Sequence, residues 1–203
     1  MYEIYLGIKR KWSISRISRE IEVSATTVLR EIRRNSNANG YNPLEINLKN
    51  VVSKNVTVKN CKFANFSNNA MTVFGMAEGG VLNIENNTFD LGKTSEAVRI
   101  SNKTNTKFTI NVKDCSYTYP TDAAGQVVGF FLFEDHTSKT AEEANAAMQF
   151  KNLKVNVDNV TFEGAKVTEL NLFTGARNQF ACMYYDKSGY VVDATHFPTF
   201  NFK

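Results

Sequence analysis

The sequence predicts a mainly β protein, a short parallel β-solenoid that follows a small all-α segment. Three observations support this prediction. A nine-residue motif occurs four times, an apolar segment follows each copy, and a basic stretch with helical patterning precedes the first copy. The copies begin at Asn55, Val81, Thr109 and Lys154. Self-similarity at a period of about 20–50 residues is the signature of a stacked repeat architecture.

Each copy of the motif opens with alternating apolar and polar residues, as in Val56-Thr57-Val58. This alternation predicts a strand with one face toward a core. A short amide or carboxylate comes next, and such a side chain can bond the backbone at a bend and tolerate unusual dihedrals. An aromatic residue follows it three positions later. The bend positions are Asn60, Asn86, Asp114 and Asn159, and the aromatic positions are Phe63, Phe89, Tyr117 and Phe162.

A second apolar segment follows each copy and predicts another strand per coil. These segments are residues 70–73, 97–100, 127–132 and 170–173. Residues 44–51 alternate in the same way and predict a partial first coil. Short strands that stack like on like define a parallel β-solenoid. Over residues 44–175 the pattern resembles the right-handed parallel β-helices of the pectate-lyase-like group, as found in phage fibre and decoration proteins.

The third coil is longer than the others and must hold an insertion. Residues 119–125 predict a loop, and Thr140-Ala-Glu-Glu143 predicts a capping box that opens a helix, which places a helical insertion near 140–148. Insertions in solenoids emerge on one face and often carry binding. A helix that covers an open edge of the sheet is an equal alternative.

The final segment, residues 176–203, departs from the repeat. Phe180–Tyr185, a turn at 186–189 and Tyr190–Val192 together predict a β-hairpin. The aromatic tail at 196–202 is expected either to cap the last coil or to pack against another subunit. The resemblance to phage fibres favours a homo-oligomer, and among oligomers a trimer.

Residues 1–35 predict a helix-turn-helix domain, and the polar, turn-rich residues 36–43 predict a linker. A first helix is expected within 2–11. Ser13 and Ser24 are suited to cap the second and third helices, which a turn at 22–24 joins. The apolar positions that are expected to face inward are Ile14, Ile17, Ile21, Val28, Leu29 and Ile32.

The stretch from Ser13 to Asn35 resembles the N-terminal domain of IS30-family transposases, above all in Thr-Thr-Val at 26–28 and Arg-Glu-Ile-Arg-Arg-Asn at 30–35. In that family the third helix enters the major groove of DNA. Glu22 stands where the family usually has a turn glycine, and Ser18 replaces a small alanine. The family's catalytic domain is replaced by the repeats, so no transposase is expected. The residues that the resemblance places on DNA or a docking partner are Ser24, Thr26, Thr27, Arg30, Arg33 and Arg34.

Charge is concentrated in the helical segment. Residues 1–43 contain eight basic and four acidic residues, which accounts for the whole net charge of +4. A basic head on a neutral body suggests that only the head meets a polyanion. The cysteines Cys61, Cys115 and Cys182 lack metal-ligand spacing and are expected to be packed thiols. No metal, cofactor, signal peptide or membrane span is expected.

Enzymes on parallel β-helices cluster charged residues on adjacent coils. The corresponding candidates here are Glu96, Arg99, Glu134, Asp135 and His136. We expect the triplet at 134–136 to be a loop of solvated charges, because charged loop residues are mostly exposed. The sequence therefore predicts no catalytic residues and no enzyme.

Three functional hypotheses remain, in order of preference. The first is a structural protein of a phage virion, a head fibre or capsid decoration assembled in the host cytoplasm and docked on capsid protein through its helices. The second is a sequence-specific DNA-binding protein that uses residues 13–35, with the solenoid as oligomerisation module. The third is a carbohydrate-binding β-helix that recognises a glycan on the host surface.

Overall fold

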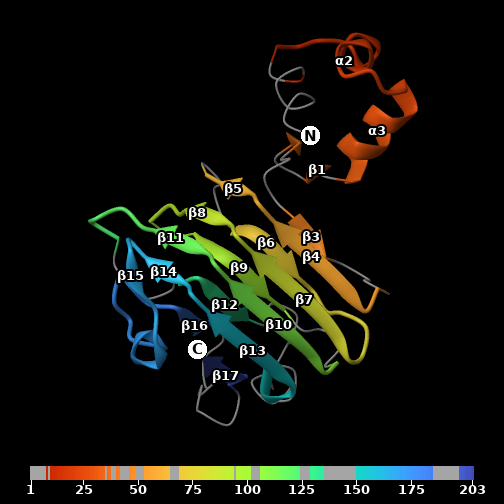
Figure 1. The fold of residues 1–203 in the computed structure, drawn as a ribbon. Helices are drawn as coiled ribbons and strands as arrows, with labels where there is room; N and C mark the ends of the chain where they lie inside the picture. The colour runs from red at the N-terminus through yellow and green to blue at the C-terminus, as the bar shows by residue number, and fades with distance from the viewer. Residues whose placement is uncertain are drawn as a thin grey trace. The chain divides into compact units, whose positions relative to one another are not determined.

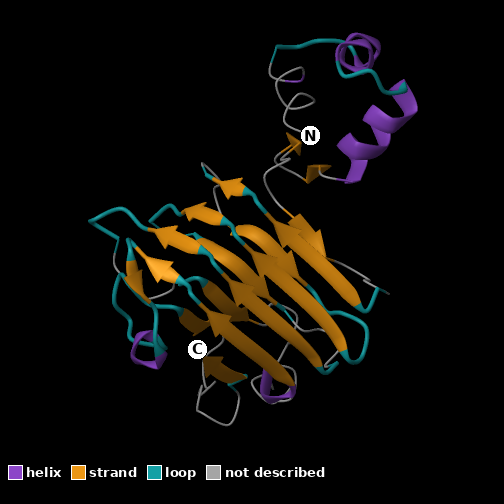
Figure 2. Ribbon diagram, in the orientation of Figure 1, coloured by secondary structure: helices purple, strands orange, loops and turns teal. Residues whose placement is uncertain are grey.

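The computed structural model forms two compact units, Met1–Ile46 and Asn47–Lys203. The protein is mainly β with parallel sheets, and its described residues include the α-helices α2 and α3 (Figures 1 and 2). The structure describes residues 8, 10–34, 36–37, 40–41, 46–48, 53–64, 69–93, 95–101, 106–123, 129–134, 150–184 and 197–203, some of them by their backbone alone.

The first unit contains helices α2 (Ile14–Glu20) and α3 (Ala25–Arg34), then an antiparallel pair of β1 (Ser36–Asn37) and β2 (Gly40–Tyr41). Both predicted helix caps are confirmed. Ser13 Oγ accepts a hydrogen bond from the Arg16 N–H at 3.2 Å, and Ser24 Oγ accepts one from the Thr27 N–H at 3.1 Å. Of the helix predicted within 2–11, the structure describes Ile8, which is helical, and Arg10 and Lys11, which form a turn; the rest lies outside the described residues.

A small apolar core joins the two helices. Ile17 of α2 and Val28 of α3 are fully buried at its centre. The prediction that Leu29 faces inward is wrong, because 40% of its surface is exposed. A step of one residue turns an α-helix by about 100°, so Val28 takes the inward position and Leu29 does not. The partly buried residues around this core are Ile8, Trp12, Ile14, Ile21 and Ile32.

The second unit contains three five-stranded sheets, and successive repeats add strands to each of them (Figure 1). The first sheet consists of β4 (Asn55–Lys59), β7 (Gly80–Glu85), β10 (Phe108–Lys113), β13 (Leu153–Asp158) and β17 (Thr199–Phe202). The second consists of β5 (Lys62–Phe63), β8 (Thr88–Asp90), β11 (Ser116–Thr118), β14 (Thr161–Phe162) and the antiparallel β15 (Ala165–Lys166). The third consists of β3 (Ile46–Leu48), β6 (Asn69–Val73), β9 (Glu96–Ile100), β12 (Phe131–Glu134) and β16 (Ala181–Tyr184).

The strand register confirms the alignment of the four motif copies. In the first sheet, Asn55 pairs with Val81, Val81 with Thr109, and Thr109 with Lys154. The alternating apolar residues of β7, β10 and β13 are buried, as one-sided strands require. The predicted aromatic column is also in register across the second sheet, and its members are Phe63, Phe89, Tyr117 and Phe162.

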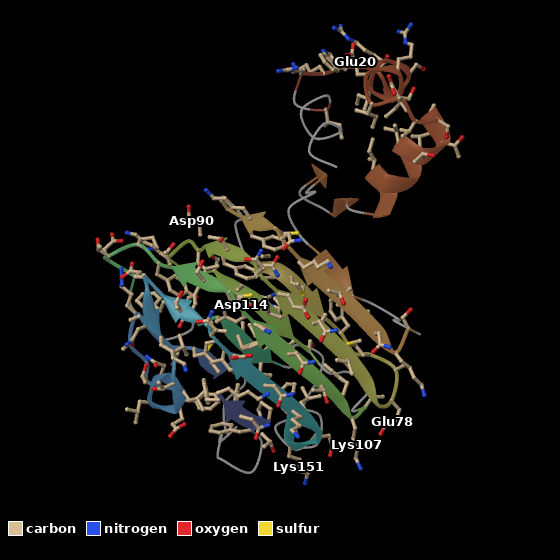
Figure 3. The ribbon with its side chains drawn as sticks, viewed as in Figure 1. Glu20, Glu78, Asp90, Lys107, Asp114 and Lys151 are labelled. Atoms are coloured by element: carbon tan, nitrogen blue, oxygen red, sulfur yellow. The ribbon has the colours of Figure 1, made fainter. Side chains whose placement is uncertain are left out.

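The bend after each first-sheet strand has the backbone that its short polar residue predicts. Asn60, Asn86, Asp114 and Asn159 have φ angles of 58°, 50°, 51° and 51°, in the left-handed region that Asn and Asp tolerate best. Their side chains bond from one repeat to the next. Asn86 Nδ2 donates to Asn60 Oδ1 at 2.9 Å, and Asn159 Nδ2 donates to Asp114 Oδ1 at 2.7 Å (Asp114 is labelled in Figure 3).

This bend column predicts that Asp114→Asn stabilises the second unit. A carboxylate cannot donate, whereas an amide at 114 keeps the bond from Asn159 and gains a donor toward Asn86. We expect the free energy of unfolding to rise by about 0.5–1 kcal/mol, measured by urea denaturation. Asp90→Asn, on the exposed face of β8, is the charge-matched control. An equal gain from both variants would assign the effect to net charge and not to the column.

The predicted second strands agree with the structure in two repeats and differ in the others. Strands β6 and β9 fall on the predicted segments, but β12 begins at Phe131. The strand predicted at 170–173 is wrong, because Thr168 caps a 3₁₀ turn at Glu169–Asn171. The third sheet continues instead with β16, which pairs with β12 in parallel.

The repeat therefore extends beyond residue 175. Residues 181–184, expected in a separate hairpin, form β16 of the third sheet, and β17 pairs with β13 in parallel. The aromatic tail thus adds a rung to the first sheet, which agrees with the capping alternative. The helical insertion near 140–148 and the rest of the predicted hairpin lie outside the described residues.

Candidate functional site

The backbone of the turn between α2 and α3 explains why glycine suits position 22. Glu22 has a φ of 55°, and the N–H groups of Val23 and Glu22 donate to the carbonyls of Ser18 and Arg19 at 3.0 and 3.4 Å. This pair of bonds is a Schellman motif, whose left-handed residue is usually glycine. Glu22 therefore adopts the required conformation at a steric cost.

We predict that Glu22→Gly stabilises the first unit by about 1 kcal/mol, because glycine adopts this φ without a Cβ clash. The chain's single tryptophan, Trp12, packs against the core of this unit, so its fluorescence during urea unfolding reports on that unit. Glu22→Gln removes the same charge but keeps the strain, and it should leave the midpoint nearly unchanged. A matching rise in Glu22→Gln would contradict the conformational explanation.

The beginning of α3 presents hydroxyl groups to solvent. Ser24, Thr26 and Thr27 are all exposed, as a contact surface requires. Ser24 Oγ lies 2.9 Å from Thr27 Oγ1, which orients both around the helix N-terminus. Arg30, Arg33 and Arg34 follow on α3, but their side chains lie outside the described residues.

A cation–π cluster at the beginning of α2 was not predicted from the sequence. The Arg16 guanidinium lies 4.3 Å from the centre of the Trp12 ring, and that of Arg10 lies 5.3 Å from it. Arg19 is also exposed, and its Nε donates to the Ser15 carbonyl at 3.3 Å. These contacts hold cations at defined positions beside the helix-turn-helix, where a polyanion would meet them. The available signal was an aromatic residue just before the cap of α2 with arginines on both sides of it in the sequence.

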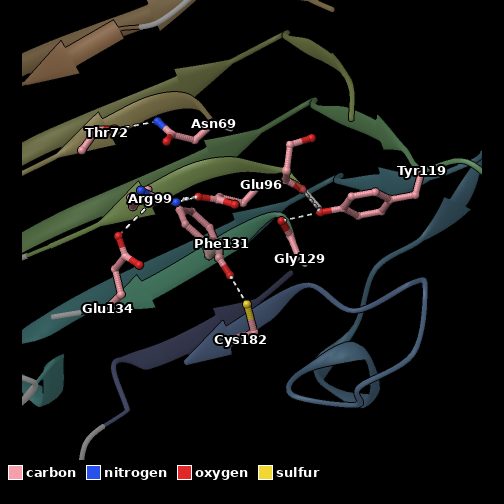
Figure 4. Close-up of polar contacts among 10 residues, drawn as sticks. Asn69, Thr72, Glu96, Arg99, Tyr119, Gly129, Phe131, Glu134 and Cys182 are labelled. Atoms are coloured by element: carbon pink, nitrogen blue, oxygen red, sulfur yellow. Dashed lines mark hydrogen bonds and ion pairs between the residues drawn. The ribbon is translucent and has the colours of Figure 1, made fainter. Parts of the chain in front are cut away.

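Three of the five charged candidates on adjacent coils, Glu96, Arg99 and Glu134, lie in contact in the third sheet (Figure 4). Arg99 Nε lies 2.7 Å from Glu96 Oε1 and 2.9 Å from Glu134 Oε1. Only 1% of Glu96 and 2% of Glu134 is exposed, so the expectation of solvated charges is wrong for Glu134. Asp135 and His136 lie outside the described residues.

Burial of Glu96 raises the pKa of its carboxyl to about 7, although the neighbouring Arg99 lowers it. With both carboxyls ionised, one guanidinium faces two negative charges. A proton on Glu96 makes the group electrically neutral. This arrangement ties β9 to β12, and because both carboxyls are buried it does not form an open acid–base site.

We predict that stability falls as pH rises from about 4.5 to about 7, because folded Glu96 holds its proton while the unfolded carboxyl loses it. Below the unfolded pKa both states are protonated, so the favourable contribution is complete there. Glu96→Gln should flatten the urea midpoint across this window. An unchanged slope would show that another group titrates.

Several other buried polar groups in the described body make internal hydrogen bonds. The Tyr119 hydroxyl is 2.9 Å from the Ser95 carbonyl and 2.8 Å from that of Gly129 (Figure 4). Asn69 Nδ2 donates to Thr72 Oγ1 at 2.6 Å. Cys115 and Cys182 are buried free thiols, as predicted, and Cys61 is half-buried. Burial raises the pKa of Cys115 to about 11, which keeps this thiol protonated and unreactive.

The comparisons with known proteins found no matching family model, no matching curated protein and no matching solved structure. Among the described residues, no three potential metal ligands gather in one place. No helix in that part of the chain is long and apolar enough to cross a membrane.

Proposed function

We propose that this chain is a non-enzymatic structural protein of a phage virion, a head fibre or capsid decoration. Its body would be a short right-handed parallel β-solenoid, and its N-terminal helix-turn-helix would be the anchor on capsid protein. Assembly in the host cytoplasm follows from this proposal. A glycan on the host surface is a further candidate partner for the exposed body.

The observation that carries the proposal is the way the body uses its polar side chains. On the outer face of the first sheet, Asn111 donates to Asn83 at 2.8 Å, Asn156 to Asn111 at 2.8 Å, and Asn201 to Asn156 at 2.9 Å. Each amide is thereby engaged with the next rung. A column of this kind stiffens a body, as amide ladders do in stacked β structures. A body whose described polar side chains bond to one another in this way suits a structural part.

The test is quantitative mass spectrometry of gradient-purified particles from the phage whose genome encodes this chain. The proposal requires the chain to co-sediment with the major capsid protein at a fixed ratio. A chain that stays in the soluble fraction of the lysate would overturn it. Arg30→Ala with Arg33→Ala should reduce incorporation, whereas Lys166→Ala, on the exposed β15 of the body, should not.

Sequence-specific DNA binding is the second candidate, and the exposed hydroxyls at the beginning of α3 favour it. In a helix-turn-helix, residues at this end of the second helix contact base edges. A gel-shift titration at two salt concentrations distinguishes the proposals. DNA binding requires tight, sequence-selective complexes that weaken steeply with salt, and Arg30→Ala with Arg33→Ala should flatten that dependence. If the helix-turn-helix is an anchor on capsid protein, the gel shift should show no sequence-selective complex with DNA.

A further inference from the structure

One outward position of the first sheet carries charges that alternate from rung to rung. Lys59 pairs in register with Glu85, Glu85 with Lys113, and Lys113 with Asp158, and the Lys203 N–H donates to Val157 beside Asp158. Both ends of this column are therefore lysines. The members of the column are Lys59, Glu85, Lys113, Asp158 and Lys203.

This column opposes head-to-tail stacking of copies. Such stacking would place β4 of one copy beside β17 of the next in the same parallel register. Lys59 would then face Lys203, and like charges directly opposite each other destabilise strand pairing. Exposed lysines on edge strands are a known protection against open-ended assembly.

The β17 edge also presents aromatic surface. Phe200 and Phe202 continue the inward positions of Val155 and Val157, which are 0% and 2% exposed, yet both phenylalanines are only half-buried. Phe173 stacks on Phe197 next to them with ring centres 4.0 Å apart, and 6.2 Å separates the Phe173 and Phe200 rings. The last rung thus leaves part of the aromatic core uncovered.

The hydrogen bonding of β17 shows which of its residues direct their backbone N–H and C=O groups away from β13. Because the Lys203 N–H donates to the Val157 carbonyl at 2.9 Å, Lys203 directs its backbone groups toward β13. Backbone groups alternate in direction along a strand, so Asn201 shares that orientation while Phe200 and Phe202 direct theirs outward. In the described part of the chain, no strand pairs with this outer edge of β17.

We propose that β17 pairs antiparallel with β17 of a second copy of this chain, about a two-fold axis at Asn201. Phe200 of one copy then exchanges both backbone hydrogen bonds with Phe202 of the other. By symmetry, Phe202 of the first copy does the same with Phe200 of the second. Asn201 faces its own counterpart at a non-hydrogen-bonded position, where Cα atoms are about 4.5 Å apart. Lys203 faces Thr199 of the second copy, so no like charges oppose each other.

The contact is self-complementary and closes on itself. Asn201 Nδ2 already donates to Asn156, and its Oδ1 is an acceptor for the amide of the second copy. One strand edge accepts one neighbour, so the assembly is an isologous dimer and not the trimer favoured by the resemblance to fibres. Pairing joins two five-stranded sheets into one and covers the half-exposed aromatic residues. This inference does not depend on the proposed virion function.

A cysteine at the two-fold axis tests the geometry directly. Non-hydrogen-bonded antiparallel neighbours fall within the Cα separation of about 4.4–6.8 Å that a disulfide requires. We expect full-length Asn201→Cys to form a disulfide-linked dimer under mild oxidation. Thr57→Cys, at the equivalent position on β4, should remain monomeric on the same non-reducing gel. The wild-type protein, oxidised in the same way, is the control for any cross-link through the half-buried Cys61.

A mass measurement on untreated protein completes the test. Light scattering after size exclusion should give twice the 22.8 kDa chain mass. Asn201→Asp, which places two carboxylates at the axis, should shift the protein to monomer while its circular dichroism spectrum is kept. A wild-type monomer, a wild-type trimer or an Asn201→Cys chain that does not cross-link would each overturn the proposal. Cross-linking only in a mixture of Thr57→Cys and Asn201→Cys chains would show head-to-tail stacking instead.

Discussion

Replacement of Arg99 by methionine should lower the free energy of unfolding of the second unit by about 3–5 kcal/mol. Arg99 is the cation shared by Glu96 and Glu134, and both carboxyls are almost fully buried. Methionine approximates the aliphatic part of the arginine side chain, so packing is largely kept. The loss then measures the cost of two buried carboxyls without a positive charge.

A rescue variant separates this electrostatic cost from simple misfolding. In the Arg99→Met background, Glu96→Gln with Glu134→Gln replaces both ionisable carboxyls by neutral amides and should restore most of the lost stability. Lys93→Met is the surface control, since Lys93 pairs with Asp122 and both side chains are exposed. Exposed pairs contribute about 0–1 kcal/mol. Equal losses in the Arg99→Met and Lys93→Met variants, measured by urea denaturation followed by circular dichroism, would refute the shared-cation explanation.

Much of the fold could be predicted because the motif encodes its own register. Alternating residues such as Val56 and Val58 define the buried face, and each bend carries an Asn or Asp that tolerates a positive φ. These two signals recur at the same spacing in every copy. Parallel pairing of the copies follows from them, and the structure confirms it residue by residue.

The third sheet was harder to predict because its strands are buried on both faces. All five residues of β6 and all four of β12 are buried, so no alternation distinguishes a strand from another apolar run. The apolar run at 170–173 therefore resembled a strand, although Thr168 caps a 3₁₀ turn there. Strand β16, later in the chain, takes the place in the sheet.

The contact of Glu134 with the other buried charged residues could not be predicted from the sequence, because it lies far from them along the chain. Glu96, Arg99 and Glu134 were all named as candidates, yet Glu134 was expected in solvent because charged loop residues usually are. Only the register of β12 on β9, with Leu132 beside Arg99, brings Glu134 to the guanidinium. The outer asparagine column occupies the third position of three motif copies, where alternation places a side chain on the outer face.

The aromatic column provides the second large expected effect. Phe89→Ala should lower the free energy of unfolding by about 3–5 kcal/mol, because it removes a fully buried ring from the middle of the second sheet. The Phe89 ring stacks on Phe63 with centres 5.0 Å apart, and it meets Phe130 edge-on at 5.1 Å. The cavity would have rings on two sides, and backbone held in register could not collapse into it.

The control for Phe89→Ala is the same substitution at the end of the aromatic column. Phe63→Ala removes the first ring of the described column, which is 5% exposed, and should cost less than Phe89→Ala because one side of the site can relax. Phe89→Leu should cost about 1–2 kcal/mol, since leucine fills most of the volume. The measurement is the urea midpoint of each variant by circular dichroism. If Phe63→Ala costs as much as Phe89→Ala, the end rung is as constrained as the interior, and stability is uniform along the stack.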